Sequence, residues 1–539
     1  MSDEFFAIPA AGEPASVARM GAKAHNLARM ASLGLPVPPA FVIGTKYCAA
    51  CLDAGGLVPE VSQRLPALMA ALENGTALRF GDERRPLLVS VRSGAPASMP
   101  GMMQTLLNIG LTERTLAGFL RTSGNPRLVH DAYRRLIAQY GETVEGIDPQ
   151  VFDGAQEAIA AGRDERALDF AELRAIAQRF LAAYREASGT PFPQDARDQL
   201  ERAIDAVFRS WRAPHAIAYR AANGIAEVPG TAVIVQAMVF GNAGGRSGAG
   251  VGFSRDPATG DPQLCVDFLV NAQGEDVVSG RRIARGPAQL AAAMPAIWTS
   301  LVEAARRLEA EFADMQDIEF TVQDGRLFLL QTRAGKRSAV AALRIMLDLH
   351  DEGIIDRAAL RERASEIDVE HLSVTRIAGE EGQTATPIAI GASASVGVAV
   401  GEIALDEARA RERAAAGAAI ILVRRDAETA DLPALQLAQG VLTARGARTS
   451  HAAVVARSLG RVCVVGCEGL AIDTASRSVR FGETTFREGD VIAVDGNTGR
   501  VYDGPVRTLE ERPAALLDRL ARALAGRVAA EPAEVQVAG

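Results

Sequence analysis

The sequence predicts a multidomain chain of mixed α/β and α+β class, and three observations support this. Its 539 residues allow roughly three to five domains of about 100–200 residues each. Apolar, strand-like segments alternate with helical segments before residue 112 and after residue 212. The stretch between these limits is rich in Ala, Arg, Glu and Leu at helical spacing, and a Gly- and Ser-rich stretch near residue 384 precedes a new series of strands and helices.

The composition excludes several classes of protein. Hydrophobic residues make up 48% and charged residues 23%, which argues against a disordered or fibrous chain. The net charge of −8 offers no general attraction for nucleic acid. No apolar run approaches the length of a membrane span, the N-terminus lacks the pattern of a secretory signal, and cysteines are few. We therefore expect a cytoplasmic protein with no nucleic-acid or membrane partner.

Shifts in composition divide the chain into six expected segments. In order, they are a strand–helix region at 1–111, a helical subdomain at 112–212, a second strand–helix region at 213–340, a helical connector and linker at 341–384, a compact domain at 385–505, and a C-terminal helix and tail at 506–539. Within these segments we expect one continuous helix at 287–312 and another at 506–526.

A glycine-rich loop follows a strong strand in the second strand–helix region. Residues 241–252 read GNAGGRSGAGVG, and glycines without a Cβ let backbone N–H groups approach phosphate oxygens. The loop has no Gly-Lys-Ser/Thr and joins two strands, so it is neither a P-loop nor a dinucleotide-binding turn. The alternative is a flexible hairpin loop. The candidate phosphate-binding glycines are Gly241, Gly244, Gly245, Gly248 and Gly250.

Residues 317–333 have the pattern of a hairpin with an Asp-Gly turn. Asp317 and Glu319 share one face of the first strand, and Gln331 and Arg333 share one face of the second. Carboxylates in this setting suit Mg²⁺, which holds nucleotide phosphates through few protein ligands. The alternative is a solvated polar face with exposed ion pairs.

The length of the turn decides whether these two faces coincide. A two-residue turn would set Glu319 beside Leu330, whereas a three-residue turn would set it opposite Gln331 and align all four polar side chains. We expect the three-residue turn, with Gly325 left-handed, because it leaves the other face uniformly apolar.

Two basic residues near the N-terminus are candidates for phosphate binding. Lys23 is one of three lysines in the chain, and Arg92 ends an apolar strand that runs into small residues. A guanidinium in that position can direct its fork at a phosphate. Taken one at a time, each is better explained as a surface charge.

His451 differs from the other five histidines because several features coincide there. A strand ends in a Gly- and Thr-containing segment, Thr449 or Ser450 can cap a helix, and His451 then lies in its first turn. The helix dipole disfavours imidazolium at this end, so a neutral, nucleophilic imidazole is expected. The same N–H groups would stabilise a phosphoryl group on the ring.

Together these clusters resemble the pyruvate, phosphate dikinase family over roughly residues 15–110, 210–340 and 385–505. The segments that carry the resemblance are VRSGAPASMPGMMQTLLNIGL, VQAMVFGNAGGRSGAGVGFSRDPATGD, NAQGEDVVSG, DIEFTVQDGRLFLLQTRAGKR and TARGARTSHAAVVARSLG. The family combines an ATP-grasp domain, a swivelling β/β/α phosphohistidine domain and a C-terminal (β/α)₈ barrel. The resemblance thus implies ATP-grasp with a helical insertion, followed by the phosphohistidine domain.

The resemblance also implies a role for each candidate residue, with ATP and inorganic phosphate as substrates and Mg²⁺ as the metal. On the nucleotide side, it implies that Lys23 and Arg92 contact phosphate, that residues 241–252 form a lid over the phosphates, that Gln236 and Met238 lie on the adenine side, and that Glu275 lies on the ribose or nucleotide side. It implies that Asp317 and Glu319 bind Mg²⁺, with Gln331 and Arg333 beside them. It implies that His451 is the phosphorylated histidine and that phosphorylation of Thr449 is regulatory.

The C-terminal end departs from the family pattern. A barrel needs about 250 residues, and 34 residues follow residue 505. We therefore expect a chain that phosphorylates His451 from ATP and passes the group to an acceptor or barrel protein in trans, with homodimer formation left open. The alternatives are a dikinase-like phosphotransferase for another acceptor, of the phosphoenolpyruvate synthase or antibiotic phosphotransferase kind, and a non-catalytic ATP-binding remnant.

Overall fold

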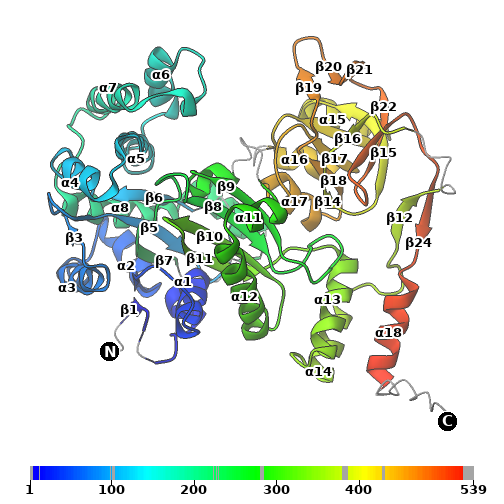
Figure 1. The fold of residues 1–539 in the computed structure, drawn as a ribbon, viewed down its shortest axis with the longest axis horizontal. Coiled ribbons are helices and arrows are strands. Elements are labelled where there is room, and N and C mark those ends of the chain that lie inside the picture. Colours follow the sequence, from blue (N-terminus) through cyan, green and yellow to red (C-terminus); the bar gives the residue numbers. More distant parts are fainter. Residues whose placement is uncertain are drawn as a thin grey trace. The chain divides into compact units, whose positions relative to one another are not determined.

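The computed structural model describes residues 4–525 apart from residues 11, 98, 100–102, 223, 226, 227, 229, 279–284, 379–385 and 428–430, and only the backbone at 222, 275, 278 and 451. The chain forms two compact units. Unit 1 contains Met1–Gly248 and Phe320–Thr332, and unit 2 contains Ala249–Glu319 and Arg333–Gly539. Both contain helices and sheets (Figure 1), which confirms the mixed α/β multidomain class.

Unit 1 is built on a five-stranded sheet with the order β1-β2-β7-β5-β6. Strands β2 and β7 are buried along their whole length, as expected for central apolar strands. One continuous core joins this sheet to the helices that follow β6. Its strands are β1 (Phe5–Ile8), β2 (Ala40–Ile43), β5 (Val89–Gly94), β6 (Thr105–Ile109) and β7 (Ala232–Ala237), while β3 (Arg79–Phe80) and β4 (Pro86–Leu87) pair only with each other.

The helices of unit 1 fall into two groups along the chain. Among the described residues, three α-helices precede β5, and six lie between β6 and β7 together with a π-helical turn (Gly141–Glu145) and a 3-10 turn (Glu165–Ala167). The α-helices are α1 (Val17–Ser32), α2 (Lys46–Ala54), α3 (Pro59–Thr76), α4 (Glu113–Ser123), α5 (Pro126–Tyr140), α6 (Pro149–Ala160), α7 (Phe170–Ser188), α8 (Ala196–Ser210) and α9 (Pro214–Ala222).

A four-stranded sheet with the order β11-β10-β8-β9 follows. The units divide its hairpin, because residues 320–332 belong to unit 1 and the flanking residues belong to unit 2. The elements of this region are β8 (Gly248–Phe253), β9 (Cys265–Val270), α10 (Gly274–Val278), α11 (Pro287–Ala293), α12 (Pro295–Phe312), β10 (Gln316–Gln323), β11 (Arg326–Ala334), α13 (Ala339–Asp351) and α14 (Arg357–Ser365).

The remainder of unit 2 contains an eight-stranded sheet with the order β13-β23-β22-β15-β16-β17-β18-β14. Strands β15 to β18 are parallel, and helices α15, α16 and α17 connect them, as parallel pairing requires. The elements are β12 (Val374–Ile377), β13 (Ala389–Ile390), β14 (Ala392–Ser395), β15 (Val398–Ala404), α15 (Glu407–Ala415), β16 (Ile420–Arg424), α16 (Leu432–Leu437), β17 (Gly440–Thr443), α17 (His451–Ser458) and β18 (Val462–Val465).

Smaller sheets complete unit 2. Strands β19 to β21 form a three-stranded sheet, and β12 pairs with β24. The elements are β19 (Leu470–Asp473), β20 (Ser478–Phe481), β21 (Thr484–Arg487), β22 (Val491–Asp495), β23 (Arg500–Asp503), β24 (Thr508–Glu511) and α18 (Ala514–Ala525). Among the described residues, no helix combines the length and apolar character needed to cross a bilayer.

Two helices expected from the sequence are wrong in extent. The segment 287–312 is two helices, because Pro295 starts a second helix and Met294 leaves helical geometry (φ −142°, ψ 67°). The segment 506–526 is a helix only from Ala514 onward. Its first part contains strand β24, in which Leu509 is 45% exposed.

Candidate functional site

The β10–β11 hairpin carries the four polar residues expected at the metal and phosphate site. Two residues separate its strands, and both are left-handed, with φ of 50° at Asp324 and 76° at Gly325. The left-handed Gly325 is confirmed, but the three-residue turn is wrong. A two-residue turn with both residues left-handed has the twist that hairpin strands favour, and Asp-Gly is one of its preferred sequences.

Asp317 and Arg333 nevertheless meet. Arg333 Nε donates to Asp317 Oδ2 at 2.7 Å. Asp317 is 5% exposed, and its Oδ1 is buried without a hydrogen-bond partner. Burial raises the pKa of Asp317 although the Arg333 charge opposes this. A buried carboxylate oxygen without a donor is costly unless a cation binds it, so Asp317 fits a metal ligand.

The other residue predicted to bind the metal is Glu319. Glu319 is half-buried on β10, two residues from Asp317. Among the described residues, no group of three or more His, Cys, Asp or Glu side chains could hold a metal ion.

Unit 1 brings Arg92 to strand β11. Arg92 Nη1 donates to the Leu330 carbonyl at 3.4 Å, and Nη2 donates to Gln331 Oε1 at 3.5 Å. Gln331 is buried (4% exposed). Its side-chain amide, which the sequence predicts beside the metal, therefore contacts Arg92, which the sequence predicts to bind phosphate.

Lys23 lies in α1, two residues after the point at which this helix contacts strand β5. The helix kinks at Gly21, whose φ is 78°, and a Cβ there would lie 1.7 Å from the Gly94 carbonyl oxygen. The Ala22 N–H donates to the Ala95 carbonyl at 3.0 Å. The backbone of this helix therefore meets the end of the strand that carries Arg92.

The two residues expected on the adenine side lie at the end of β7. Gln236 is 2% exposed and donates through Nε2 to the Pro38 carbonyl at 3.1 Å. Met238 follows the strand, and its N–H donates to the Leu88 carbonyl at 2.9 Å. Glu275 belongs to α10, but its side chain lies outside the described residues.

The glycine-rich loop is shorter than expected. Strand β8 begins at Gly248, so Gly248 and Gly250 lie in a strand and the loop itself is 241–247. We call residues 241–247 the lid. Strands β7 and β8 belong to different sheets, so the alternative of a hairpin loop is wrong. Gly244 has φ of 145°, a conformation that favours glycine.

Helix α17 begins at His451, as predicted. Ser450 is its N-cap, and its side chain accepts from the Ala453 N–H at 3.5 Å. The helix follows parallel strand β17 and leads to β18, so His451 lies just beyond the carboxyl end of a parallel strand. Crevices beyond such strand ends are the usual ligand sites of parallel sheets. The side chain of His451 lies outside the described residues.

Thr449 is held by an acid from the neighbouring sheet of unit 2. Its N–H donates to Asp267 Oδ2 at 3.0 Å, and Thr449 is 8% exposed. Burial raises the pKa of Asp267, and the hydrogen bond from the Thr449 N–H and the charge of Arg448 oppose this. The residue expected to be phosphorylated by a kinase is therefore buried in this arrangement.

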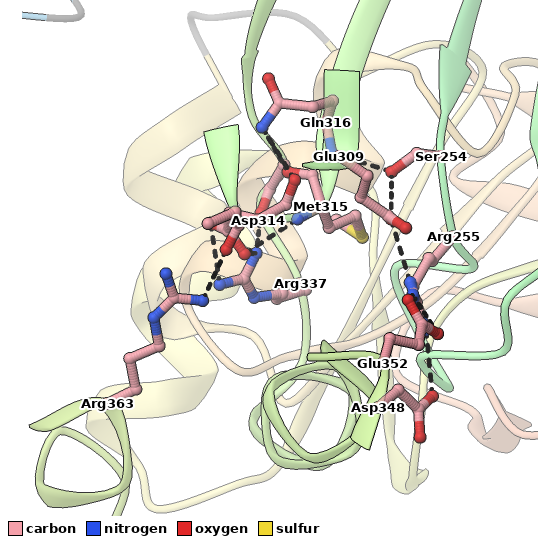
Figure 2. Close-up of polar contacts among 12 residues, drawn as sticks. Ser254, Arg255, Glu309, Asp314, Met315, Gln316, Arg337, Asp348, Glu352 and Arg363 are labelled. Atoms are coloured by element: carbon pink, nitrogen blue, oxygen red, sulfur yellow. Dashed lines mark hydrogen bonds and ion pairs between the residues drawn. The ribbon is translucent and has the colours of Figure 1, made fainter. Parts of the chain in front are cut away.

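Sequence reasoning missed the network of contacts that holds the start of β10. Figure 2 shows Ser254, Arg255 and Glu309 in one chain of contacts. Ser254 Oγ accepts from the Gln316 N–H at 2.9 Å and donates to Glu309 Oε1 at 2.7 Å. Gln316 directly precedes Asp317, so this network sets the position of the strand that carries the predicted metal ligand.

Arg255 is the centre of that network and is 2% exposed. It donates from Nε to Glu309 at 3.0 Å, from Nη1 to Asp348 at 3.0 Å and from Nη2 to Glu352 at 3.0 Å. Burial disfavours its charge, but Glu309 and Glu352 outweigh burial and raise its pKa.

A second residue was missed although its segment was recognised. Gln273 is 6% exposed, and both polar atoms of its amide are buried without a hydrogen-bond partner. Such an amide is unusual in a folded protein and is expected where a ligand or water completes the bonds. Its position in NAQGED, two residues before Glu275, was the available signal.

The chain is similar to proteins and domains of known family. The family described as "Pyruvate phosphate dikinase, AMP/ATP-binding domain" matches residues 65–293 and 288–352, and the one described as "PEP-utilising enzyme, mobile domain" matches residues 417–499.

Curated relatives named pyruvate, phosphate dikinase match almost the whole chain. Identity is 42% over 514 residues with the Clostridium symbiosum protein, covering 93% of this chain and 58% of the relative. It is 41% over 508 residues with the Rhizobium meliloti protein, covering 91% and 56%, and 41% over 495 residues with pyruvate, phosphate dikinase 2 of Zea mays, covering 90% and 55%. The chain thus spans little more than half the length of these relatives, and it belongs to the pyruvate, phosphate dikinase family.

Proposed function

We propose that this chain carries out the nucleotide half of a pyruvate, phosphate dikinase-type reaction, in which ATP phosphorylates His451. The observation that carries the proposal is the Ser450-capped start of α17 at His451, just beyond a parallel strand. In the transfer, an imidazole nitrogen forms a bond to phosphorus, and the bond from that phosphorus to its bridging oxygen breaks. The N–H groups of the first helical turn then stabilise the phosphoryl charge.

The nucleotide-binding residues have proposed roles that follow from the family and the local contacts. We propose an ATP-grasp arrangement, in which Lys23, Arg92 and Arg333 neutralise phosphate charge and the lid covers the phosphates. Gln236, Met238 and Glu275 contact the nucleoside side, and Gln331 lies beside the metal. Catalysis on this plan is positioning plus electrostatic stabilisation of the transferring group.

Mg²⁺ is the proposed metal, with Asp317 and Glu319 as its protein ligands. The buried Asp317 Oδ1 without a partner supports this role. When bound, the ion supplies charge neutralisation at the phosphate oxygens. Asp317 and Arg333 contribute by presenting one carboxylate oxygen while the other is held by the guanidinium.

The test is isotopic labelling with ATP carrying ³²P at the β or γ position, with Mg²⁺ and with or without phosphate. We expect label that is labile in acid and stable in base, as phosphoramidates are, and its loss in His451→Asn. His371→Asn is the matched control, because His371 is an exposed histidine whose ring bonds to the nearby Asp368. The β- and γ-labelled products show whether phosphate or water takes the second phosphoryl.

Two outcomes would contradict the proposal. Acid-stable label that persists in His451→Asn would place the modification on Thr449 or Ser450. No label with either form of ATP, in protein that binds ATP, would favour the non-catalytic alternative. Equal labelling of the wild type and the His371→Asn control is required in either case.

The acceptor site is proposed to lie outside residues 1–539, on a barrel or on another phosphoacceptor. The phosphohistidine domain is proposed to swivel to it in the cytoplasm, and regulation at Thr449 and homodimer formation stay predictions. Incubation of the pure chain with ATP, phosphate and pyruvate should yield no phosphoenolpyruvate. Sustained phosphoenolpyruvate synthesis would show that the acceptor site lies within this chain.

A further inference from the structure

We propose that the tip of the β10–β11 hairpin is a clasp that holds both ends of the lid, and that Gln323 and Ser247 are its positioning residues. This inference rests on the proposed function, because it assigns the lid to the outer phosphates of ATP. It adds a role for the turn itself, which carries none of the residues expected to bind nucleotide or metal.

The first end of the lid is held by Gln323. The Phe240 N–H donates to Gln323 Oε1 at 2.8 Å, and Phe240 directly precedes the lid. Phe240 is 8% exposed and packs on Phe119, with ring centroids 5.0 Å apart. The chain thus enters the lid from a residue that is fixed by both a hydrogen bond and ring packing.

The second end is held by the two turn residues. The Asp324 N–H donates to Ser247 Oγ at 3.0 Å, and the Gly325 N–H donates to the Arg246 carbonyl at 2.9 Å. Ser247 is fully buried. Gly325 is required here, because its φ is 76° and a Cβ would lie 2.6 Å from Arg246 Nη2.

The middle of the lid makes a hydrogen bond within the lid, from the Ser247 N–H to the Gly244 carbonyl at 2.9 Å, but its contacts with the rest of unit 1 are longer. Asn242 Nδ2 reaches Asp131 Oδ2 at 3.4 Å, and Asn125 Nδ2 reaches the Ala243 carbonyl at 3.3 Å, both longer than usual hydrogen bonds. A Cβ at Gly244 would meet no atom within 4 Å. Fixed ends and an open, glycine-containing middle are what a lid needs to close on a ligand without losing its position.

The clasp should act on affinity through the population of competent lid conformations. A lid with one end released samples more conformations, and the apparent dissociation constant rises as the competent fraction falls. Loss of one neutral hydrogen bond corresponds to roughly a five-fold change. The effect should be confined to ligands that carry the outer phosphates, since only those reach the lid.

The experiment compares two ligands of the same protein by calorimetry. The ligands are a non-hydrolysable ATP analogue with Mg²⁺, and AMP. In Ser247→Ala and in Gln323→Leu we expect the analogue to bind about five-fold more weakly, with AMP affinity unchanged within about two-fold. Gln178→Leu, which removes an exposed glutamine from α7, is the matched control and should change neither affinity.

Hydrogen exchange without nucleotide provides an independent readout. The amides of Phe240 and Asp324 should exchange faster in Gln323→Leu and Ser247→Ala respectively, because each loses its acceptor. Gly325→Ala, which crowds Arg246 instead of removing an acceptor, should weaken analogue binding in the same direction.

The outcomes separate the clasp from the proposed function. Unchanged analogue affinity and unchanged exchange in the variants would overturn the clasp, as would equal weakening of analogue and AMP. If the wild type binds the analogue no better than AMP, the lid does not contact the outer phosphates and the inference is contradicted. Hydrogen exchange would still show whether the turn holds the lid. Failure to label His451 in protein that behaves as expected here would reject the proposed function alone.

Discussion

Replacing Arg255 with methionine should be among the most destabilising single changes in unit 2. The side chain is 3% exposed and makes ion pairs to Glu309, Asp348 and Glu352. Methionine retains much of the volume but leaves the three carboxylates without their shared cation. Removing one partner of a buried ion pair costs about 3–5 kcal/mol, because the remaining charge is uncompensated.

The surroundings of each carboxylate place the expected cost at the lower end of that range. Glu309, with 10% side-chain exposure, retains only the neutral donor Ser254. Asp348 retains Arg519, which donates to Oδ1 at 2.7 Å. Glu352 has 46% side-chain exposure and can hydrate. We therefore expect a loss of about 3 kcal/mol, most of it from Glu309.

Two further variants test whether charge geometry is the cause. Arg255→Lys keeps the charge but replaces a fork of donors with a single ammonium, so about 1–2 kcal/mol should be lost. Arg344→Met removes an ion pair to Asp261 whose side chains are 35% and 45% exposed, and it should cost less than about 1 kcal/mol. Adding Glu309→Gln to Arg255→Met should restore part of the stability by removing the unpaired charge.

Tryptophan fluorescence provides the assay. The chain has two tryptophans, and Trp298 lies in α12, the helix that carries Glu309. In a Trp211→Phe background, denaturant unfolding reports on this helix alone, and the common background cancels in the differences between variants. A loss below about 1 kcal/mol in Arg255→Met would refute the reasoning, because the carboxylates would then be compensated by other means.

Two other predictions concern the site itself. Asp267→Asn should stabilise unit 2 at neutral pH, since burial raises the pKa of Asp267 and ionisation is then a cost in the folded state. The wild type loses stability as pH rises through that raised pKa, so the stability advantage of the variant should vanish as pH falls toward the ordinary aspartate pKa of about 3.9. Thermal melting at a series of pH values measures this advantage. An advantage that grows at low pH would contradict the prediction. Arg333→Ala should weaken binding of the non-hydrolysable ATP analogue about ten-fold, as expected for a lost charge-assisted contact at a partly exposed group, while His451→Asn leaves that binding nearly unchanged. Equal affinity of Arg333→Ala and wild type in calorimetry would remove Arg333 from the phosphate site.

The sequence identified features that depend on local pattern. The cap and start of α17 follow from Thr449, Ser450 and His451 in a row, because a helix cap needs only its own side chain and the next turn. Strand β10 and its partner were evident from apolar alternation around an Asp-Gly pair. Each feature is encoded within one continuous segment of the chain, which is the range that pattern reasoning covers.

The turn length was predicted wrongly because two local signals disagreed. A clean apolar face favoured three residues, whereas Asp-Gly favours a two-residue turn with both residues left-handed. The backbone preference prevailed at Asp324 and Gly325. The Asp317–Arg333 ion pair was predicted from a hairpin with a three-residue turn. It forms although the turn has two residues, so it does not require the predicted register.

Networks formed by distant residues could not be predicted from one sequence. Arg255 is 54 residues from Glu309, 93 from Asp348 and 97 from Glu352, and nothing in its local segment distinguishes it from the other arginines. The lid contacts are of the same kind, since Gln323 is 83 residues from Phe240. Such contacts depend on which strands become neighbours, and a single pattern of residues does not specify that.

The β10–β11 hairpin is where these distant contacts converge, and they act on different parts of it. The Ser254–Gln316 bonds hold the first residue of β10, and the turn at the other end binds the lid through backbone N–H groups. Asp317 lies next to the first contact and seven residues from Asp324. A defect at Ser254 should therefore disturb the proposed metal ligand more than the lid, whereas a defect at Ser247 should do the reverse. Because separate contacts hold the two ends of the hairpin, we expect the proposed metal site and the lid to be alterable one at a time.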